Sequence, residues 1–357
     1  MDDKGHDHHD ILSFRMWQAR LYGAGDLRFE EAPLDSSPIT GKQIYMETDV
    51  SALSTGTDLG NFSGDSTYVP GAPDYPRWVG YSNAGIVRAA GPEVTFAKPG
   101  ERYFTTRPHL SAFIAEEPQL LARIPEGVPS EQASLAYLCN LGLQSLQKVG
   151  FRPGEDVAIS GLGVIGLCTV SLARAMGAQS VIALANSPVR ADVARKMGAT
   201  ETIVANTPEG RKRIEEARDE MADIVVLTAN SWDAYRDSME IVRKCGRVPI
   251  LGFPGRGQAA PDFNPLAPGW LYRKQLGLFG AGFAPASDVP HFEIRFNLKR
   301  NLAYLMELLA QKRMDFGPVI SHRFPARRML EAYHIAAQHS KEFTAAVFDW
   351  SEFHHAL

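Results

Sequence analysis

The second half of the chain alternates between short apolar runs and longer segments in which apolar residues recur at helical spacing. Runs of this length, rich in Val, Ile, Leu and Ala, are typical of strands that are buried on both faces. They lie at 156–160, 180–184, 223–227, 247–251 and 276–280. The segments between them, led by 167–176 and 189–197, have helical spacing. We therefore predict an α/β fold with a doubly wound parallel sheet that has helices on both faces.

The first 135 residues have a different pattern from the second half of the chain. Their apolar stretches are short and are separated by Gly and Pro clusters such as 71–76 and 98–102. This pattern predicts a β-rich domain with irregular connections. A helix is expected over 130–147, with Ser130 as its N-cap. A later helix at 301–311 and a strand at 345–350 are expected to rejoin the first domain. We place the β-rich domain at 11–139 and 284–357 and the α/β domain at 140–283.

Composition narrows the function classes. The chain has 357 residues, 45% of them apolar and 22% charged, which is a globular balance for about two domains. A formal net charge of −4 without a basic block argues against nucleic-acid and membrane partners. Three scattered cysteines argue against a disulfide framework and a structural zinc site, so we expect a reducing, cytoplasmic location. The polar residues 1–10 predict a disordered tail and not a secretory signal, although their histidines leave metal binding open.

A glycine motif, Gly161-Leu-Gly163-Val-Ile-Gly166, lies between a predicted strand and a predicted helix. In this context the first glycine permits a sharp turn, the second lets main-chain N–H groups approach a pyrophosphate, and the third lets the helix pack on the strand. We therefore expect the turn, with Val164 and Ile165 at the start of the helix, to bind a dinucleotide. A glycine turn in an unrelated α/β domain is the alternative.

The end of the second strand bears on the choice of cofactor. NAD sites carry a carboxylate there, which accepts hydrogen bonds from the ribose 2′-hydroxyl. This chain instead has Asn186, Ser187 and Arg190, with nothing acidic before Asp192. A carboxylate would repel a 2′-phosphate, whereas Arg190 could pair with it, so we predict NADPH/NADP. The alternative is that Arg190 is a solvated residue of the next helix.

These residues together support a resemblance. The chain resembles the medium-chain dehydrogenase/reductase superfamily, which has the fold of the zinc alcohol dehydrogenases, over nearly its whole length after residue 20. The resemblance is carried by the Rossmann glycines and by the segments Gly80–Gly85, Lys98–Arg102, Gly246–Gly252 and Val319–Phe324. It implies a Rossmann domain joined to a GroES-like catalytic domain, with Leu251 and Gly252 beside the cofactor, and a homodimer. Ser54–Asp58 and Gly80–Ser82 are most similar to a bacterial subgroup compared with bacteriochlorophyllide dehydrogenases.

The chain departs from the family at the zinc ligands. The resemblance implies a catalytic zinc held by a Cys, by the His of a Gly-His-Glu motif and by a later Cys. Here Thr55 and Tyr81 occupy the first two positions, and only Cys139 remains. Neutral hydroxyl groups are poor zinc ligands, and the four-cysteine loop of a structural zinc is missing too. We therefore predict that the protein binds no metal.

Without zinc, another group must stabilise the oxygen of a reduced substrate. We expect Tyr81 to donate a hydrogen bond and a proton to a carbonyl oxygen. The resemblance implies that Thr57 is a proton-relay hydroxyl and that Asp58 orients the residue at position 81. Alternatively, Tyr81 only fills the volume of a lost ligand.

A substrate pocket is expected to be lined by Thr55, Trp78, Cys139 and His291, the last within a long segment after the final sheet strand. His291 could equally be a surface residue. The predicted function is a zinc-independent, NADPH-dependent oxidoreductase that transfers hydride between the nicotinamide and a carbonyl/alcohol substrate. One alternative is reduction of a polarised C=C or C=N bond, and another is a non-catalytic NADPH-binding protein.

Overall fold

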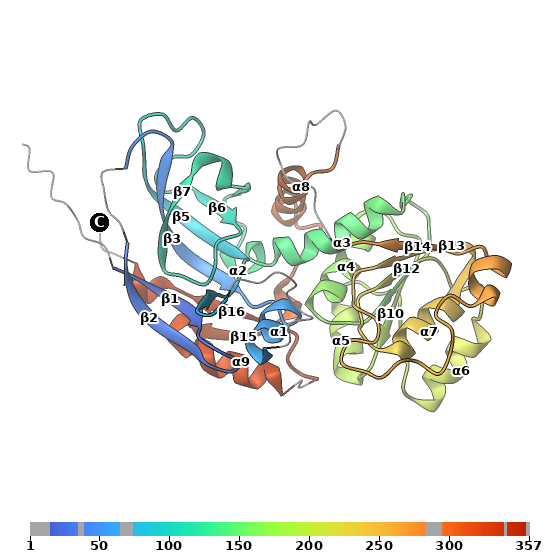
Figure 1. Cartoon of the computed structure of the whole chain (residues 1–357). Helices are drawn as coiled ribbons and strands as arrows, with labels where there is room; N and C mark the ends of the chain where they lie inside the picture. The colour runs from blue at the N-terminus through green and yellow to red at the C-terminus, as the bar shows by residue number, and fades with distance from the viewer. Residues whose placement is uncertain (1–14, 35–38, 65–73, 283–294, 339–340, 355–357) are drawn as a thin grey trace, which may run out of the picture.

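A computed structural model of the chain describes residues 15–34, 39–64, 74–282, 295–338 and 341–354. Within these residues the strands form two separate sheet systems, one in each half of the molecule (Figure 1). The long helix α3 (Ala136–Lys148) lies between the two halves and packs against α4 of one and α8 of the other. The predicted segregation into a β-rich half and an α/β half is therefore present.

The α/β half is built on a parallel sheet of six strands, as far as the described residues show. Its strands are β9 (Val157–Ser160), β10 (Val181–Ala185), β11 (Glu201–Val204), β12 (Ala222–Leu227), β13 (Val242–Ile250) and β14 (Gly277–Gly280). Their order in the sheet is β11-β10-β9-β12-β13-β14, which is the 3-2-1-4-5-6 order of a doubly wound dinucleotide-binding sheet. The predicted fold class is confirmed.

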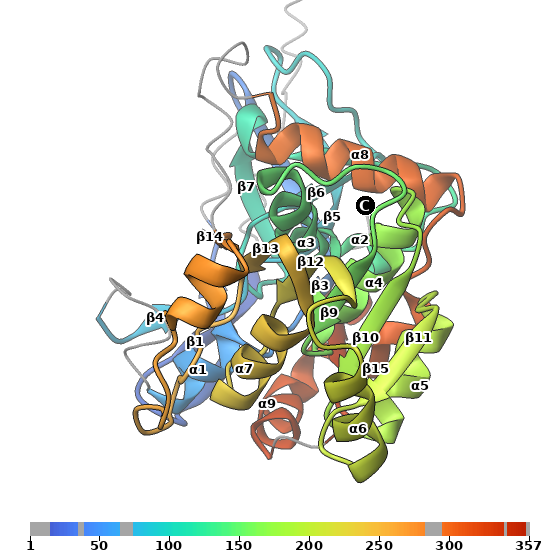
Figure 2. The same cartoon turned by 90° about the vertical axis from the view of Figure 1, so that its right-hand side faces the viewer.

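Helices connect these strands. They are α4 (Val164–Ala175), α5 (Pro188–Lys196), α6 (Pro208–Glu216) and α7 (Trp232–Ile241). Figure 2 shows α5 and α6 beside the edge strand β11. Ser187, Thr207 and Ser231 cap the starts of α5, α6 and α7, because each side-chain oxygen accepts a main-chain N–H three residues later. These caps begin each helix directly after a strand ends, so loops at the carboxyl edge of the sheet stay short.

The β-rich half contains the remaining strands. A three-stranded sheet has the order β2 (Leu27–Pro33), β1 (Arg15–Leu21), β4 (Arg77–Trp78). A larger sheet has the order β15-β16-β3-β5-β6-β8, with β7 paired to β3. Its strands are β3 (Gln43–Ala52), β5 (Asn83–Ala90), β6 (Arg102–Thr105), β7 (Ala112–Glu116), β8 (Ala122–Ile124), β15 (Ile320–Pro325) and β16 (Ala345–Asp349). Because β16 pairs with β3, the C-terminal segment completes the sheet that the N-terminal segment began.

The other helices of this half are α1 (Thr57–Ser63), α2 (Ser130–Ala133), α8 (Leu298–Ala310) and α9 (Met329–Ala337). The helix expected over 130–147 is divided into α2 and α3 at Ser134 and Leu135. The Ser134 hydroxyl donates to the Glu131 carbonyl, which competes with continuous helical hydrogen bonding at this point. Within the described part of the chain, no helix is long and apolar enough to cross a membrane.

Candidate active site

A cavity of about 710 Å³ lies at the carboxyl edge of the parallel sheet. Doubly wound sheets bind ligands at this edge, where the strand order reverses between β9 and β12. The wall of the cavity is completed from the other half of the molecule by the segment before α1 and by Phe343. Its lining includes Ser54, Thr55, Gly56, Leu59, Gly161, Gly163, Val164, Ile165, Gly166, Asn186, Arg190, Asn206, Arg211, Thr228, Asp237 and Phe343.

The glycine turn forms the floor of this cavity. Gly161 has φ +99°, and a Cβ there would lie 2.6 Å from the Ala229 nitrogen. A Cβ on Gly166 would lie 1.9 Å from the Gly161 carbonyl oxygen, so both positions need glycine for packing. A Cβ on Gly163 would meet nothing within 4 Å, because this residue, the N-cap of α4, faces open space. The turn therefore leaves room for a phosphate at the N-terminus of α4, as a dinucleotide requires.

The residues expected to select the cofactor lie at one end of the cavity. Asn186 is exposed, whereas the Ser187 hydroxyl accepts the Arg190 main-chain N–H as the cap of α5. The Arg190 guanidinium donates to the Leu162 carbonyl at 2.7 Å and to the Phe343 carbonyl at 3.0 Å. Arg190 thus links the glycine turn to the β-rich half, in addition to lining the cavity.

A second arginine, Arg211, lines the same cavity and was not predicted from the sequence. It forms a bidentate ion pair with Asp237, with one N–O distance of 2.9 Å. Its Nε donates to the carbonyl of Ala205, whose own N–H bonds the Ala185 carbonyl at the end of β10. A sequence signal for Arg211 is lacking, because it enters the cavity only through the pairing of β10 with β11.

On the side of the β-rich half, the phenol of Tyr81 lies among hydroxyl groups. Its oxygen is 2.6 Å from Ser54 Oγ and 3.5 Å from Thr57 Oγ1. The ring of Tyr137, on α3, meets the Tyr81 ring edge-on with 5.2 Å between the ring centroids. Burial raises the pKa of Tyr81 above its usual value, and the nearby Asp58 carboxylate adds to this effect. Tyr81 is therefore neutral and protonated at physiological pH. The sequence analysis did not assign roles to Ser54 or Tyr137.

Asp58 is buried next to the hydroxyl groups of Tyr81, Ser54 and Thr57. Its two oxygens accept the main-chain N–H groups of Ser54 at 2.8 Å and Gly80 at 3.0 Å. Asp58 therefore holds the main chain of the two segments that carry Tyr81 and Ser54. It orients the phenol only indirectly, because its hydrogen bonds go to main-chain N–H groups. Burial raises the pKa of Asp58 to about 6, against the opposing effect of the two hydrogen bonds. The imidazole of His109 lies next to Asp58, and burial lowers its pKa to about 3.

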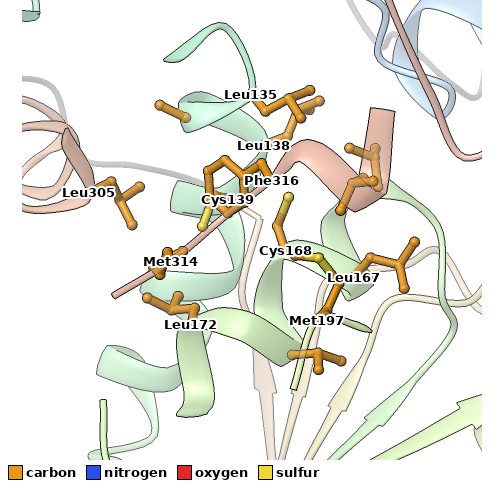
Figure 3. Close-up of a cluster of buried hydrophobic side chains, with 14 of the residues drawn as sticks. Leu135, Leu138, Cys139, Leu167, Cys168, Leu172, Met197, Leu305, Met314 and Phe316 are labelled. Atoms are coloured by element: carbon orange, nitrogen blue, oxygen red, sulfur yellow. The ribbon is translucent and has the colours of Figure 1, made fainter. Parts of the chain in front are cut away.

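The other predicted pocket residues are dispersed. Thr55 lines the cavity. Cys139 is fully buried in the hydrophobic core with Leu138, Met314, Phe316 and Cys168, which differs from the expected place on the pocket wall (Figure 3). The reason is that α3 turns this side chain toward its packing partners. Trp78 is 52% exposed, on the two-residue strand β4. His291 lies outside the described residues.

The segment after β13 packs against the end of β12, and the place of Leu251 and Gly252 beside a cofactor stays a prediction. The N–H groups of Leu251 and Gly252 bond the Leu227 carbonyl at 2.9 and 3.0 Å. A Cβ on Gly252 would lie 2.3 Å from the Ala229 carbonyl oxygen. Among the described residues, no group of three or more His, Cys, Asp and Glu side chains is arranged to hold a metal ion.

Comparisons with known proteins agree with this architecture. Residues 164–294 match the family model "Zinc-binding dehydrogenase". The chain is 38% identical over 167 residues to the 5-exo-hydroxycamphor dehydrogenase of Pseudomonas putida, a match that covers 45% of each chain. It thus spans about half the length of that relative. It is 24% identical over 352 residues to the sorbitol dehydrogenase of Gallus gallus, covering 88% of this chain and 91% of that one.

The fold is also found among solved structures. The L-idonate 5-dehydrogenase of Escherichia coli str. K-12 substr. MG1655 superposes with a TM-score of 0.78, at 15% identity, over 95% of this chain and 99% of that one. Residues 164–294 match the zinc-binding dehydrogenases, and nearly the whole chain has the fold of the solved dehydrogenases.

Proposed function

We propose that this protein is an NADPH-dependent oxidoreductase that interconverts a carbonyl compound and its alcohol without a catalytic zinc. The observation that carries the proposal is the position of Tyr81. Its phenol occupies the sequence position of a family metal ligand and lies 2.6 Å from the hydroxyl of Ser54, a residue of the cavity wall. A proton donor is thereby held next to the compartment where a dinucleotide would lie.

The cavity fits a nicotinamide dinucleotide, because its floor is a glycine turn with open space at Gly163. When bound, the cofactor supplies or accepts the hydride. NADPH is favoured because β10 is followed by Asn186 and Ser187 with no carboxylate, and because two guanidinium groups line this end. Arg211 is already neutralised by Asp237, so Arg190 is the side chain proposed to bind the 2′-phosphate.

The donor set does not fit a zinc ion. Thr55 and Tyr81 offer neutral hydroxyls, and zinc in proteins prefers thiolate, imidazole and carboxylate ligands. Burial raises the pKa values of the Tyr81 phenol and the Cys139 thiol, which disfavours the anionic forms that a metal would need. This chemistry supports a mechanism in which hydrogen bonds replace a Lewis acid.

In the proposed mechanism Tyr81 donates its proton to the carbonyl oxygen as the carbonyl carbon gains a hydride. The raised pKa keeps the phenol protonated until that oxygen becomes strongly basic. Asp58 contributes by holding the main chain at Ser54 and Gly80. Tyr137 restricts the phenol ring from the opposite side, through the edge-on contact.

Two measurements test the proposal. Fluorescence titration compares the affinities for NADPH and NADH, and tighter binding of NADH would contradict the cofactor assignment. Tyr81→Phe is expected to lower kcat for carbonyl reduction by roughly 10²–10⁴-fold. Unchanged turnover in this variant would instead favour reduction of a polarised C=C or C=N bond, which needs no strong oxygen partner. A homodimer in the cytoplasm stays a prediction, and light scattering of the purified protein checks the dimer.

A further inference from the structure

Ser54 is part of the cavity wall, and its hydroxyl oxygen is 2.6 Å from the phenol oxygen of Tyr81. Ser54 is only 3% exposed, yet it contributes to the cavity wall. Its main chain is held at both ends by Asp58: the Ser54 N–H bonds the carboxylate at 2.8 Å, and the Ser54 carbonyl accepts the Asp58 N–H at 2.9 Å. Only the side-chain hydroxyl of Ser54 is therefore left to interact with Tyr81 and with the contents of the cavity.

The distances identify which hydroxyl is the partner of the phenol. A phenol carries one proton, and 2.6 Å to Ser54 Oγ is a strong hydrogen bond, whereas 3.5 Å to Thr57 Oγ1 is at the limit of one. Thr57, which the resemblance implied as the relay, is thus in the weaker position. Within the described residues, the Ser54 hydroxyl has no other side-chain acceptor that would compete for its own proton.

We propose that Ser54 returns the proton that Tyr81 gives to the substrate, and so is the relay between the phenol and solvent in the cavity. This inference rests on the proposed carbonyl reduction. The Tyr81 O–H bond breaks as the substrate oxygen is protonated and the substrate carbon gains the hydride. The phenolate oxygen then takes the Ser54 proton, and Ser54 Oγ takes a proton from solvent. The net change is one hydride and one proton added to the carbonyl.

The Tyr81 side chain is partly buried, and its phenol is hydrogen-bonded to a serine of the cavity wall. Burial and the Asp58 carboxylate both disfavour the phenolate, so an isolated Tyr81 would be slow to give up its proton. A hydroxyl at 2.6 Å can donate to the developing phenolate in the same step. Ser54 acts here through Tyr81 and is a positioning and relay residue, not a residue that contacts the reacting carbon.

The experiment compares variants of the full-length protein with NADPH and 4-nitrobenzaldehyde as the carbonyl probe. Ser54→Ala is expected to lower kcat roughly 10–100-fold, to leave the Kd for NADPH unchanged, and to enlarge the solvent deuterium isotope effect on kcat. Ser54→Thr retains the hydroxyl and is expected to restore most of kcat. Ser63→Ala removes a hydroxyl from the exposed end of the same α1 segment and serves as the matched control for folding and turnover.

Three outcomes separate the inference from the proposed function. If Tyr81→Phe lowers kcat and Ser54→Ala does not, the relay is wrong and the carbonyl reductase proposal stands. If Thr57→Ala lowers kcat more than Ser54→Ala does, the proton passes through Thr57 and the inference is overturned. If Tyr81→Phe leaves kcat unchanged, the proposed function fails first, and the relay fails with it.

Discussion

His109 Nε2 lies 4.0 Å from Asp58 Oδ2 in the buried layer behind Tyr81. The other imidazole nitrogen of His109 is 2.8 Å from Ser51 Oγ, which also accepts the Trp350 indole N–H at 2.9 Å. His109 Nδ1 and Ser51 Oγ share one hydrogen bond, whereas His109 Nε2 is buried and has no hydrogen-bond partner among the described residues. Asp58 and His109 are therefore two neighbouring buried titratable groups that share no hydrogen bond.

These two groups have opposite effects on how stability depends on pH. Burial lowers the pKa of His109 from its usual value of 6.5 to about 3 in the folded state, so the unfolded chain binds more protons between these values and stability rises with pH. Burial raises the pKa of Asp58 from its usual value of 3.8 to about 6 in the folded state, so the folded chain binds more protons between these values and stability falls as pH rises. Between about pH 4 and 6 the two effects oppose each other.

Asp58→Asn removes the contribution of Asp58 to the pH dependence of stability and leaves that of His109. The difference in free energy of unfolding, variant minus wild type, is then expected to rise by about 1.4 kcal/mol for each pH unit between roughly pH 4 and 6. The variant is also destabilised by about 1–3 kcal/mol at pH 8, because the Asn amide cannot accept both the Ser54 and the Gly80 N–H. Chemical denaturation at several pH values measures both effects. Parallel pH profiles for variant and wild type would contradict the assigned pKa of Asp58.

His109→Gln removes the contribution of His109 to the pH dependence of stability and leaves that of Asp58. Gln can still accept the Ser51 hydroxyl, but it does not titrate. The free energy of unfolding is expected to fall by about 1.4 kcal/mol per pH unit, relative to wild type, over the same interval. His334→Gln, at a surface-facing position of α9, is the control histidine removal. A profile for His109→Gln that matches this control would contradict the lowered pKa of His109 in the folded protein.

Gly163→Ala and Gly166→Ala separate ligand contact from packing within one motif. The added Cβ at Gly163 meets nothing, so stability is expected to change by less than about 1 kcal/mol while NADPH affinity falls at least roughly 10-fold. The added Cβ at Gly166 would lie 1.9 Å from a main-chain oxygen, so this variant is expected to lose several kcal/mol, about 3 or more. Thermal unfolding and NADPH titration measure the pair. Equal loss of stability in both would contradict the open space above Gly163.

The sequence predicted the parallel sheet well, because contiguous apolar runs that alternate with helical spacing are local signals. It did not predict that the Tyr81 phenol bonds Ser54 in preference to Thr57. That choice depends on how the main chain turns into α1, which Asp58 sets through two hydrogen bonds. His109 and the carbonyl of Phe343 were also missed, since both reach the site through strand pairing between distant segments.

Arg190 provides the last prediction, because it combines a cofactor contact with a link between the two halves of the molecule. Arg190→Met removes the donors to the Leu162 and Phe343 carbonyls, which alone would weaken NADPH and NADH binding equally. If the guanidinium also binds the 2′-phosphate, NADPH affinity is expected to fall roughly 10–100-fold more than NADH affinity. Arg195→Met, on the exposed side of α5, is the matched control and should change neither affinity. Parallel losses for both cofactors in Arg190→Met would leave Arg190 as an interdomain link only and would remove the main support for NADPH.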